Sequence, residues 1–126
     1  KVALYRGARH SLEGRVMFIN TDEASPAAAY LTLNDPQAEA MRISRDVAAG
    51  YMIRTRADAD TVEACRNDTR RREAAFASGA QYISTDYLWP DPRFGDYSVQ
   101  LPGGGVARCN PRGASACQAT APGTHP

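Results

Sequence analysis

Two short polar stretches follow apolar runs in this 126-residue sequence, and both contain side chains suited to binding a charged ligand. Arg54 and Arg56 lie in the first stretch, YMIRTRAD, and Asp86 and Tyr87 end the second, AQYISTDY. Residues two apart on a strand point in the same direction, so the two Arg share a face. Buried charges need partners, and guanidinium groups match phosphate oxygens well. The spacing therefore favours an anion such as phosphate at the strand ends.

The same residues allow a second interpretation that needs no ligand. Arg54 and Arg56 could instead form ion pairs with Asp58 and Asp86, giving an internal network that closes the structure. A strand can also become polar simply because it reaches the surface. The residues alone leave these alternatives open.

Three apolar runs predict the strands that would carry these residues, near 15–20, 51–56 and 80–85. Helical patterns cover 35–50 and 60–79, between the runs. An alternation of strand and helix at this period predicts parallel strands joined by right-handed crossovers. We expect the strands to be adjacent in chain order, with both helices on one face. In such architectures, ligand sites lie at the carboxyl ends of the strands.

Each helical pattern ends at a glycine, Gly50 in the first and Gly79 in the second. The second pattern is rich in charge, and pairs of opposite charge are routine on exposed helices. We therefore expect its charged residues to form a solvated face: Glu63, Arg66, Asp68, Arg70, Arg71 and Arg72.

The composition suits one soluble globular unit or part of a larger one, with 43% hydrophobic residues and a net charge of +1. No apolar run reaches the roughly 18 residues that a transmembrane helix needs. A near-neutral charge argues against a dedicated nucleic-acid binder. The chain begins at Lys1 with no signal-peptide core after it, so we expect it to be processed or cut from a longer one.

Three cysteines are present, at positions 65, 109 and 117. Cys109 and Cys117 flank a loop short enough to close as a disulfide, which would indicate an oxidising compartment. Two unpaired thiols in a cytosolic tail are equally compatible with this spacing. A metal site is disfavoured, because no other Cys or His is close in sequence to complete four ligands.

Four stretches resemble one family. LEGRVMFIN, YMIRTRADADTVEA, NDTRRREAAFASGAQYISTDY and LPGGGVARCNP are similar to the end of the calcium-dependent phosphoinositide phospholipase C enzymes of bacterial type. The resemblance runs from about Ser11 to Pro111, and its RTRAD and STDY blocks are specific. STDY also resembles the last barrel strand of the glycerophosphodiester phosphodiesterases.

The resemblance implies an α/β fold, the C-terminal portion of a TIM-type (β/α)8 barrel with about three parallel strands and a loop-rich tail. Residues 1–108 would form the partial barrel and residues 109–126 a Cys-containing tail. It also implies a secreted protein, which favours the Cys109–Cys117 disulfide and leaves Cys65 free.

The implied reaction is Ca²⁺-dependent cleavage of inositol phospholipids, by attack of the inositol 2-hydroxyl on phosphorus with His as general base and acid. Carboxylates would hold the Ca²⁺. We expect the catalytic His and the metal ligands upstream of this chain, because His10 and His125 match no catalytic position. The chain alone would then be inactive.

The site residues implied for the head group are Arg54, Arg56, Asp86 and Tyr87. Asp86 would accept hydrogen bonds from inositol hydroxyls, and Tyr87 would stack on the ring or else pack against Trp89. Two alternatives remain: a glycerophosphodiester phosphodiesterase-like hydrolase, and a non-catalytic phosphate-binding half-barrel.

Overall fold

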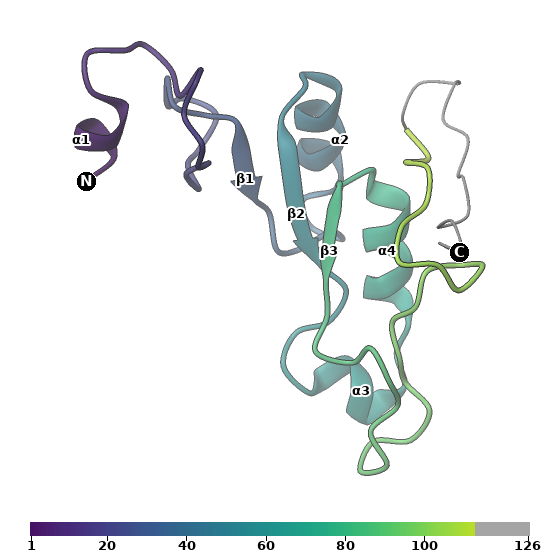
Figure 1. Ribbon diagram of the computed structural model, residues 1–126. Helices are drawn as coiled ribbons and strands as arrows, with labels where there is room; N and C mark the ends of the chain where they lie inside the picture. Colours follow the sequence, from purple (N-terminus) through teal and green to yellow (C-terminus); the bar gives the residue numbers. More distant parts are fainter. Residues whose placement is uncertain (113–126) are drawn as a thin grey trace, which may run out of the picture.

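Three short parallel strands form one open sheet in the computed structural model, which describes residues 1–112 (Figure 1). In spatial order the strands are β1 (Tyr30–Thr32), β2 (Met52–Arg56) and β3 (Tyr82–Ser84). The helices are α1 (Val2–Arg6), α2 (Ala40–Ala48), α3 (Val62–Arg66) and α4 (Arg70–Ser78). The predicted α/β class with parallel strands and helices between them is confirmed, and it is consistent with part of a barrel.

The strand register divides the side chains between two faces of the sheet. Ile53 pairs with Leu31, and both are buried beneath α2. Arg54 pairs with Thr32 and Tyr82 on the opposite face, where Tyr82 is 54% exposed. We call the face that carries Leu31 and Ile53 the helix-covered face. The second, the open face, consists of Tyr30, Thr32, Met52, Arg54, Arg56, Tyr82 and Ser84.

Two apolar clusters hold the helices against the sheet. α2 packs on β2, and α4 packs on both α2 and β2. The two helices lie on the same side of the sheet (Figure 1). The cluster under α2 comprises Leu31, Leu33, Ile43, Ile53 and Ala80. The second cluster lies toward the carboxyl ends of the strands and comprises Ala57, Ala64, Ala75, Phe76, Tyr87, Tyr97 and Val99. The expected placement of both main helices on one face is therefore correct.

The prediction of a strand near 15–20 is wrong. Val16 and Phe18 are 95% and 59% exposed, and the segment makes one isolated parallel bridge, between Asn20 and Tyr30. The first strand of the sheet is instead β1, whose Leu31 is buried under α2. An apolar run indicates that a segment needs burial but does not show what buries it, and most of this run stays exposed at Val16, Met17 and Phe18.

The single helix predicted over 60–79 is two helices. Asn67 adopts a left-handed conformation (φ 48°) that ends α3, and α4 begins three residues later. The predicted helix over 35–50 is shorter than expected, because residues 36–39 form turns. Gly50 and Gly79 follow α2 and α4 with φ of 90° and 85°. Few residues other than glycine adopt such angles, so both predicted stops are confirmed.

The solvated face predicted for the second helical pattern is only partly correct. Arg70 is 80% exposed and pairs with Asp68. The Arg71 side chain, however, is only 16% exposed, and its Nη2 donates to the Asn34 carbonyl at 2.6 Å. Arg72 donates to the Ser98 carbonyl at 2.7 Å. These two arginines connect α4 to neighbouring loops, which a charge pattern alone does not reveal.

Candidate functional site at the carboxyl ends of β2 and β3

Arg56, the last residue of β2, lies between two carboxylates. Its Nη2 donates to Asp86 Oδ2 at 3.0 Å, and the same nitrogen is 4.0 Å from Asp58 Oδ1. The Asp86 side chain is 63% exposed, whereas that of Asp58 is completely buried. Arg56 Nε is buried and has no hydrogen-bond partner within the described chain. The arginine is therefore held by one accessible carboxylate and one inaccessible one.

Asp58 organises the segment that follows β3. One of its oxygens accepts a hydrogen bond from the Thr85 hydroxyl, and the other accepts the Asp86 N–H at 3.1 Å. The Thr85 oxygen in turn accepts the Tyr87 N–H at 2.9 Å. A buried carboxylate is tolerated when its oxygens are satisfied in this way. The ends of β2 and β3 are thereby fixed relative to one another.

Arg54 does not join this network. Its Nη1 donates to Asn34 Oδ1 at 3.0 Å, in the loop after β1. Asn34 is also the residue whose carbonyl accepts from Arg71, and Arg71 Nη1 is 3.9 Å from Glu63 Oε1. The internal network considered from the sequence thus forms among Arg56, Asp58 and Asp86 only.

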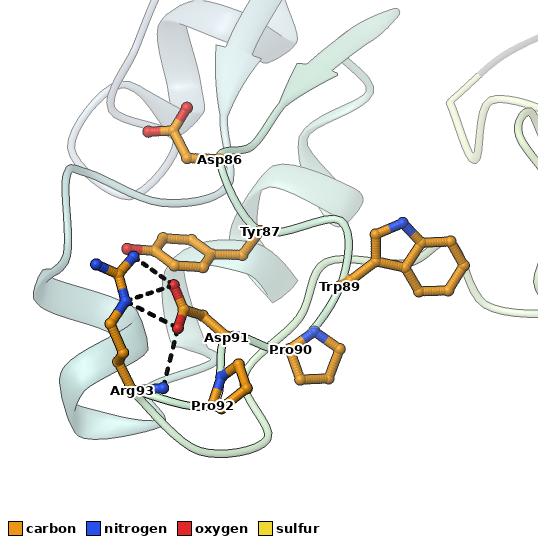
Figure 2. Close-up of a pocket in the computed structure, with 7 residues that line it drawn as sticks. All are labelled: Asp86, Tyr87, Trp89, Pro90, Asp91, Pro92 and Arg93. Carbon is orange, nitrogen blue, oxygen red and sulfur yellow. Dashed lines mark hydrogen bonds and ion pairs between the residues drawn. The ribbon is translucent and has the colours of Figure 1, made fainter.

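Tyr87 is largely buried by other aromatic rings. It is 8% exposed and makes edge-to-face contacts with Phe94 and Tyr97, with centroid distances of 6.1 and 5.6 Å. Burial raises the pKa of its hydroxyl. Trp89 is 75% exposed and points away from Tyr87 (Figure 2). Tyr87 therefore packs on Phe94 and Tyr97, and its proposed stacking on a sugar ring stays a prediction.

An open pocket of about 510 Å³ adjoins these residues and is lined by Asp86, Tyr87, Trp89, Pro90, Asp91, Pro92 and Arg93. Figure 2 shows the Asp86 carboxylate at one end and an Asp91–Arg93 pair at the other, with the Tyr87 ring between them. Arg93 Nη2 lies 2.6 Å from Asp91 Oδ2. The hydrogen bonds that the side chain and backbone of Arg93 donate to Asp91 lower the pKa of Asp91 to about 2. The Asp91 carboxyl at this end of the pocket is thus charged at neutral pH.

The carboxylates at the strand ends do not make a complete calcium site. Ca²⁺ takes about six to eight oxygen ligands. Among residues 1–112, no group of three or more His, Cys, Asp or Glu side chains is placed to hold a metal ion. Asp58 and Asp86 are already engaged by Thr85 and Arg56. The described residues therefore do not fit a bound Ca²⁺ by themselves.

The remaining candidate residues lie elsewhere. His10 is exposed in the segment after α1, and His125 lies outside the described residues. Cys65 is a free, exposed thiol on α3. Cys117 lies outside the described residues, so the Cys109–Cys117 disulfide stays a prediction, as does the division of the chain at residue 108.

The sequence did not indicate two of the residues that organise the site, Thr85 and Asn34. Asp58 was expected as a possible ion-pair partner of the arginines, but not as the acceptor that holds the segment after β3. Thr85 belongs to the STDY block but carried no signal that its hydroxyl would contact a carboxylate across the sheet. Asn34 could not be found, because β1 itself was misplaced.

Comparison with known proteins identifies a family for this chain. A family model described as Phosphoinositide phospholipase C, Ca²⁺-dependent, matches residues 1–111, which include both strand ends. No match to a curated protein or to a solved structure was found. Because the matched range covers most of the 126 residues, the chain belongs to the Ca²⁺-dependent phosphoinositide phospholipase C family.

Proposed function

We propose that this chain forms the last part of a phospholipase C barrel that cleaves the phosphodiester of inositol phospholipids, and that its strand ends bind the phosphoinositol head group. The observation that carries the proposal is the Arg56–Asp86 pair at the carboxyl ends of two parallel strands, in a chain of this family. In β/α barrels this end of the sheet is where substrates bind. The pair combines a donor for phosphate with an acceptor for hydroxyl groups.

The two partners of the pair have different roles in the proposal. Arg56 uses one nitrogen for Asp86 and its side chain is 27% exposed, so its guanidinium can donate further hydrogen bonds to a phosphate oxygen. Asp86, with its side chain 63% exposed, can accept hydrogen bonds from inositol hydroxyls. Arg54 lies on the same open face of β2 and adds a second positive charge near the anion.

The catalytic steps need groups beyond these. When bound, Ca²⁺ would offset the negative charge of the phosphate. We propose that its ligands, and the His that act as general base and acid, come from outside the described residues. The role of residues 1–112 is then to bind and orient the head group, with Tyr87 next to Asp86 in the pocket wall.

The expected location is part of the same proposal. We propose a secreted protein that acts at a membrane surface and carries the Cys109–Cys117 disulfide. No helix in residues 1–112 is long and apolar enough to span a bilayer. Thiol titration of the native protein without reductant tests the pairing: one reactive thiol, Cys65, is expected, and three would contradict it.

The proposal is tested with the full-length protein that carries this chain. Vesicles of phosphatidylinositol and phosphatidylcholine are incubated with the protein in Ca²⁺ or in excess chelator, and the products are followed by ³¹P NMR. Release of diacylglycerol and an inositol phosphate, only with Ca²⁺, is expected. Cleavage of glycerophosphoinositol but not of the lipid would favour the glycerophosphodiester phosphodiesterase alternative. Binding of inositol phosphate without turnover would favour the non-catalytic half-barrel.

A further inference from the structure

The buried carboxylate of Asp58 is positioned to act on the site without touching a ligand. It lies two residues beyond the end of β2 and is completely inaccessible to solvent. We propose that Asp58, together with Thr85, is a positioning unit that fixes Asp86 and Arg56 for the phosphoinositol head group. This inference rests on the proposed function and adds residues that do not belong to the predicted head-group contacts.

Both Asp58 oxygens accept hydrogen bonds from the segment after β3. One accepts the Thr85 hydroxyl and the other accepts the Asp86 N–H at 3.1 Å. Thr85 accepts the Tyr87 N–H at 2.9 Å with the same oxygen. Three consecutive residues after β3 are therefore tied to one buried carboxylate, which fixes the direction in which the Asp86 side chain leaves the backbone.

Arg56 lies close to both Asp58 and Asp86. Its Nη2 is 4.0 Å from Asp58 Oδ1 and 3.0 Å from Asp86 Oδ2. A phosphate arriving from solvent can reach the exposed Asp86 side of the guanidinium but not the buried Asp58 side. Arg56 can then exchange Asp86 for phosphate while Asp58 keeps it in place, and the released Asp86 carboxylate is free to accept inositol hydroxyls.

Tyr97 supports the backbone next to Asp58. The Tyr97 hydroxyl donates to the carbonyl of Ala57 at 3.2 Å, and both residues are buried in the same cluster. The backbone next to Asp58 is thus also held by a residue of the buried cluster. Displacing Asp58 would require breaking this contact as well as those to Thr85 and Asp86.

The test uses substitutions at Thr85, which are milder than removing a buried charge. Thr85→Val keeps the shape but leaves an Asp58 oxygen without its donor, whereas Thr85→Ser keeps the hydroxyl. Binding of myo-inositol 1-phosphate to the full-length protein is measured by calorimetry well below the unfolding midpoint of each variant. A change of about tenfold in Kd is expected for Thr85→Val, the size of one hydrogen bond to a charged group. Thr85→Ser should stay within about twofold, because its hydroxyl preserves the contact.

A double-mutant cycle separates positioning from a general loss of structure. If Thr85 acts through Asp86, then Thr85→Val should have little further effect in a protein that already carries Asp86→Ala. Full additivity of the two changes, or wild-type affinity for Thr85→Val, would overturn the positioning role while leaving the proposed function intact. A wild-type protein that does not bind inositol phosphate would overturn both. Arg70→Ala, on the exposed side of α4, serves as the control with unchanged Kd.

Discussion

The helix-covered face and the open face of the sheet differ in what surrounds their side chains. On the covered face, Leu31 and Ile53 are buried in one apolar cluster with Ile43 of α2. On the open face, Arg54 and Arg56 are half-buried and bonded to polar partners, and Tyr82 is 54% exposed. The covered face is packed against α2 at β1 and β2, whereas the side chains of the open face are half-buried or exposed.

The difference shows that packing and chemistry are divided between the two sides of the same three strands. In β2 the alternation of buried and half-buried residues separates Ile53 and Thr55 from Arg54 and Arg56. A change on one side should therefore lower the free energy of unfolding, and a change on the other should lower binding. The following predictions test that division in the full-length protein.

The largest expected effect is on the covered face. Ile53→Ala removes a fully buried side chain from the cluster with Leu31 and Ile43. Such truncations cost about 2–5 kcal/mol of unfolding free energy, and we expect about 3 kcal/mol from urea unfolding. Met52→Ala, on the open face, is the matched control. A loss below about 1 kcal/mol for Ile53→Ala would contradict the packing, since that is less than any comparable truncation in a core.

The next effect is on turnover. Arg56→Ala removes the guanidinium proposed to contact phosphate, and the loss should be about 2 kcal/mol, or roughly thirtyfold, in kcat/KM. Asp86→Ala should act in the same direction, while both variants keep most of the unfolding free energy. A variant that lost stability but kept its kcat/KM would show that Arg56, Asp58 and Asp86 form a structural network only.

The sequence predicted the covered face better than the site. The helical patterns, the two glycine stops and the strands near 51–56 and 80–85 were visible because local propensity and burial agree there. β1 was missed because the neighbouring run at 15–20 is more apolar, although it lies exposed. Strand-end residues were identified by type, and the Arg56–Asp86 pair was among the alternatives, but Asn34 as the partner of Arg54 and Thr85 as that of Asp58 were not expected. Contacts such as that between Thr85 and Asp58 join residues 27 positions apart. The pattern of neighbouring residues in the sequence cannot predict such contacts.

A smaller effect is expected on α4, where the two neighbouring arginines should behave differently. Arg71 donates to the Asn34 carbonyl and is 3.9 Å from Glu63, so Arg71→Ala should cost about 1–2 kcal/mol of unfolding free energy. Because Asn34 also holds Arg54, binding of inositol phosphate should weaken slightly. Arg70→Ala, which removes an exposed pair with Asp68, should change stability by less than about 0.5 kcal/mol. Equal effects at both positions, measured by urea unfolding, would show that Arg71 is as solvated as Arg70.

The smallest expected effect concerns Tyr97, which supports the end of β2 from the covered side. Its hydroxyl donates to the Ala57 carbonyl, and burial, together with the charges of Asp58 and Glu63, raises its pKa to about 12. An acid whose pKa is raised in the folded state keeps its proton while the unfolded chain loses it. Stability is therefore fully present below about pH 10, the ordinary pKa of tyrosine, and falls as the pH rises toward 12.

Tyr97→Phe removes only the hydroxyl oxygen, and so tests how the Tyr97 hydroxyl makes stability depend on pH. At pH 7 the variant should lose about 1 kcal/mol, the usual contribution of one hydrogen bond. Between pH 9 and 11.5 its unfolding free energy should fall less steeply than that of the wild-type protein, because the buried hydroxyl no longer titrates. Tyr82→Phe, on the open face, should retain the wild-type slope, since Tyr97 is still present. Parallel curves for the wild-type protein and Tyr97→Phe would mean that Tyr97 is not buried as described, and that the covered face is open at the end of β2.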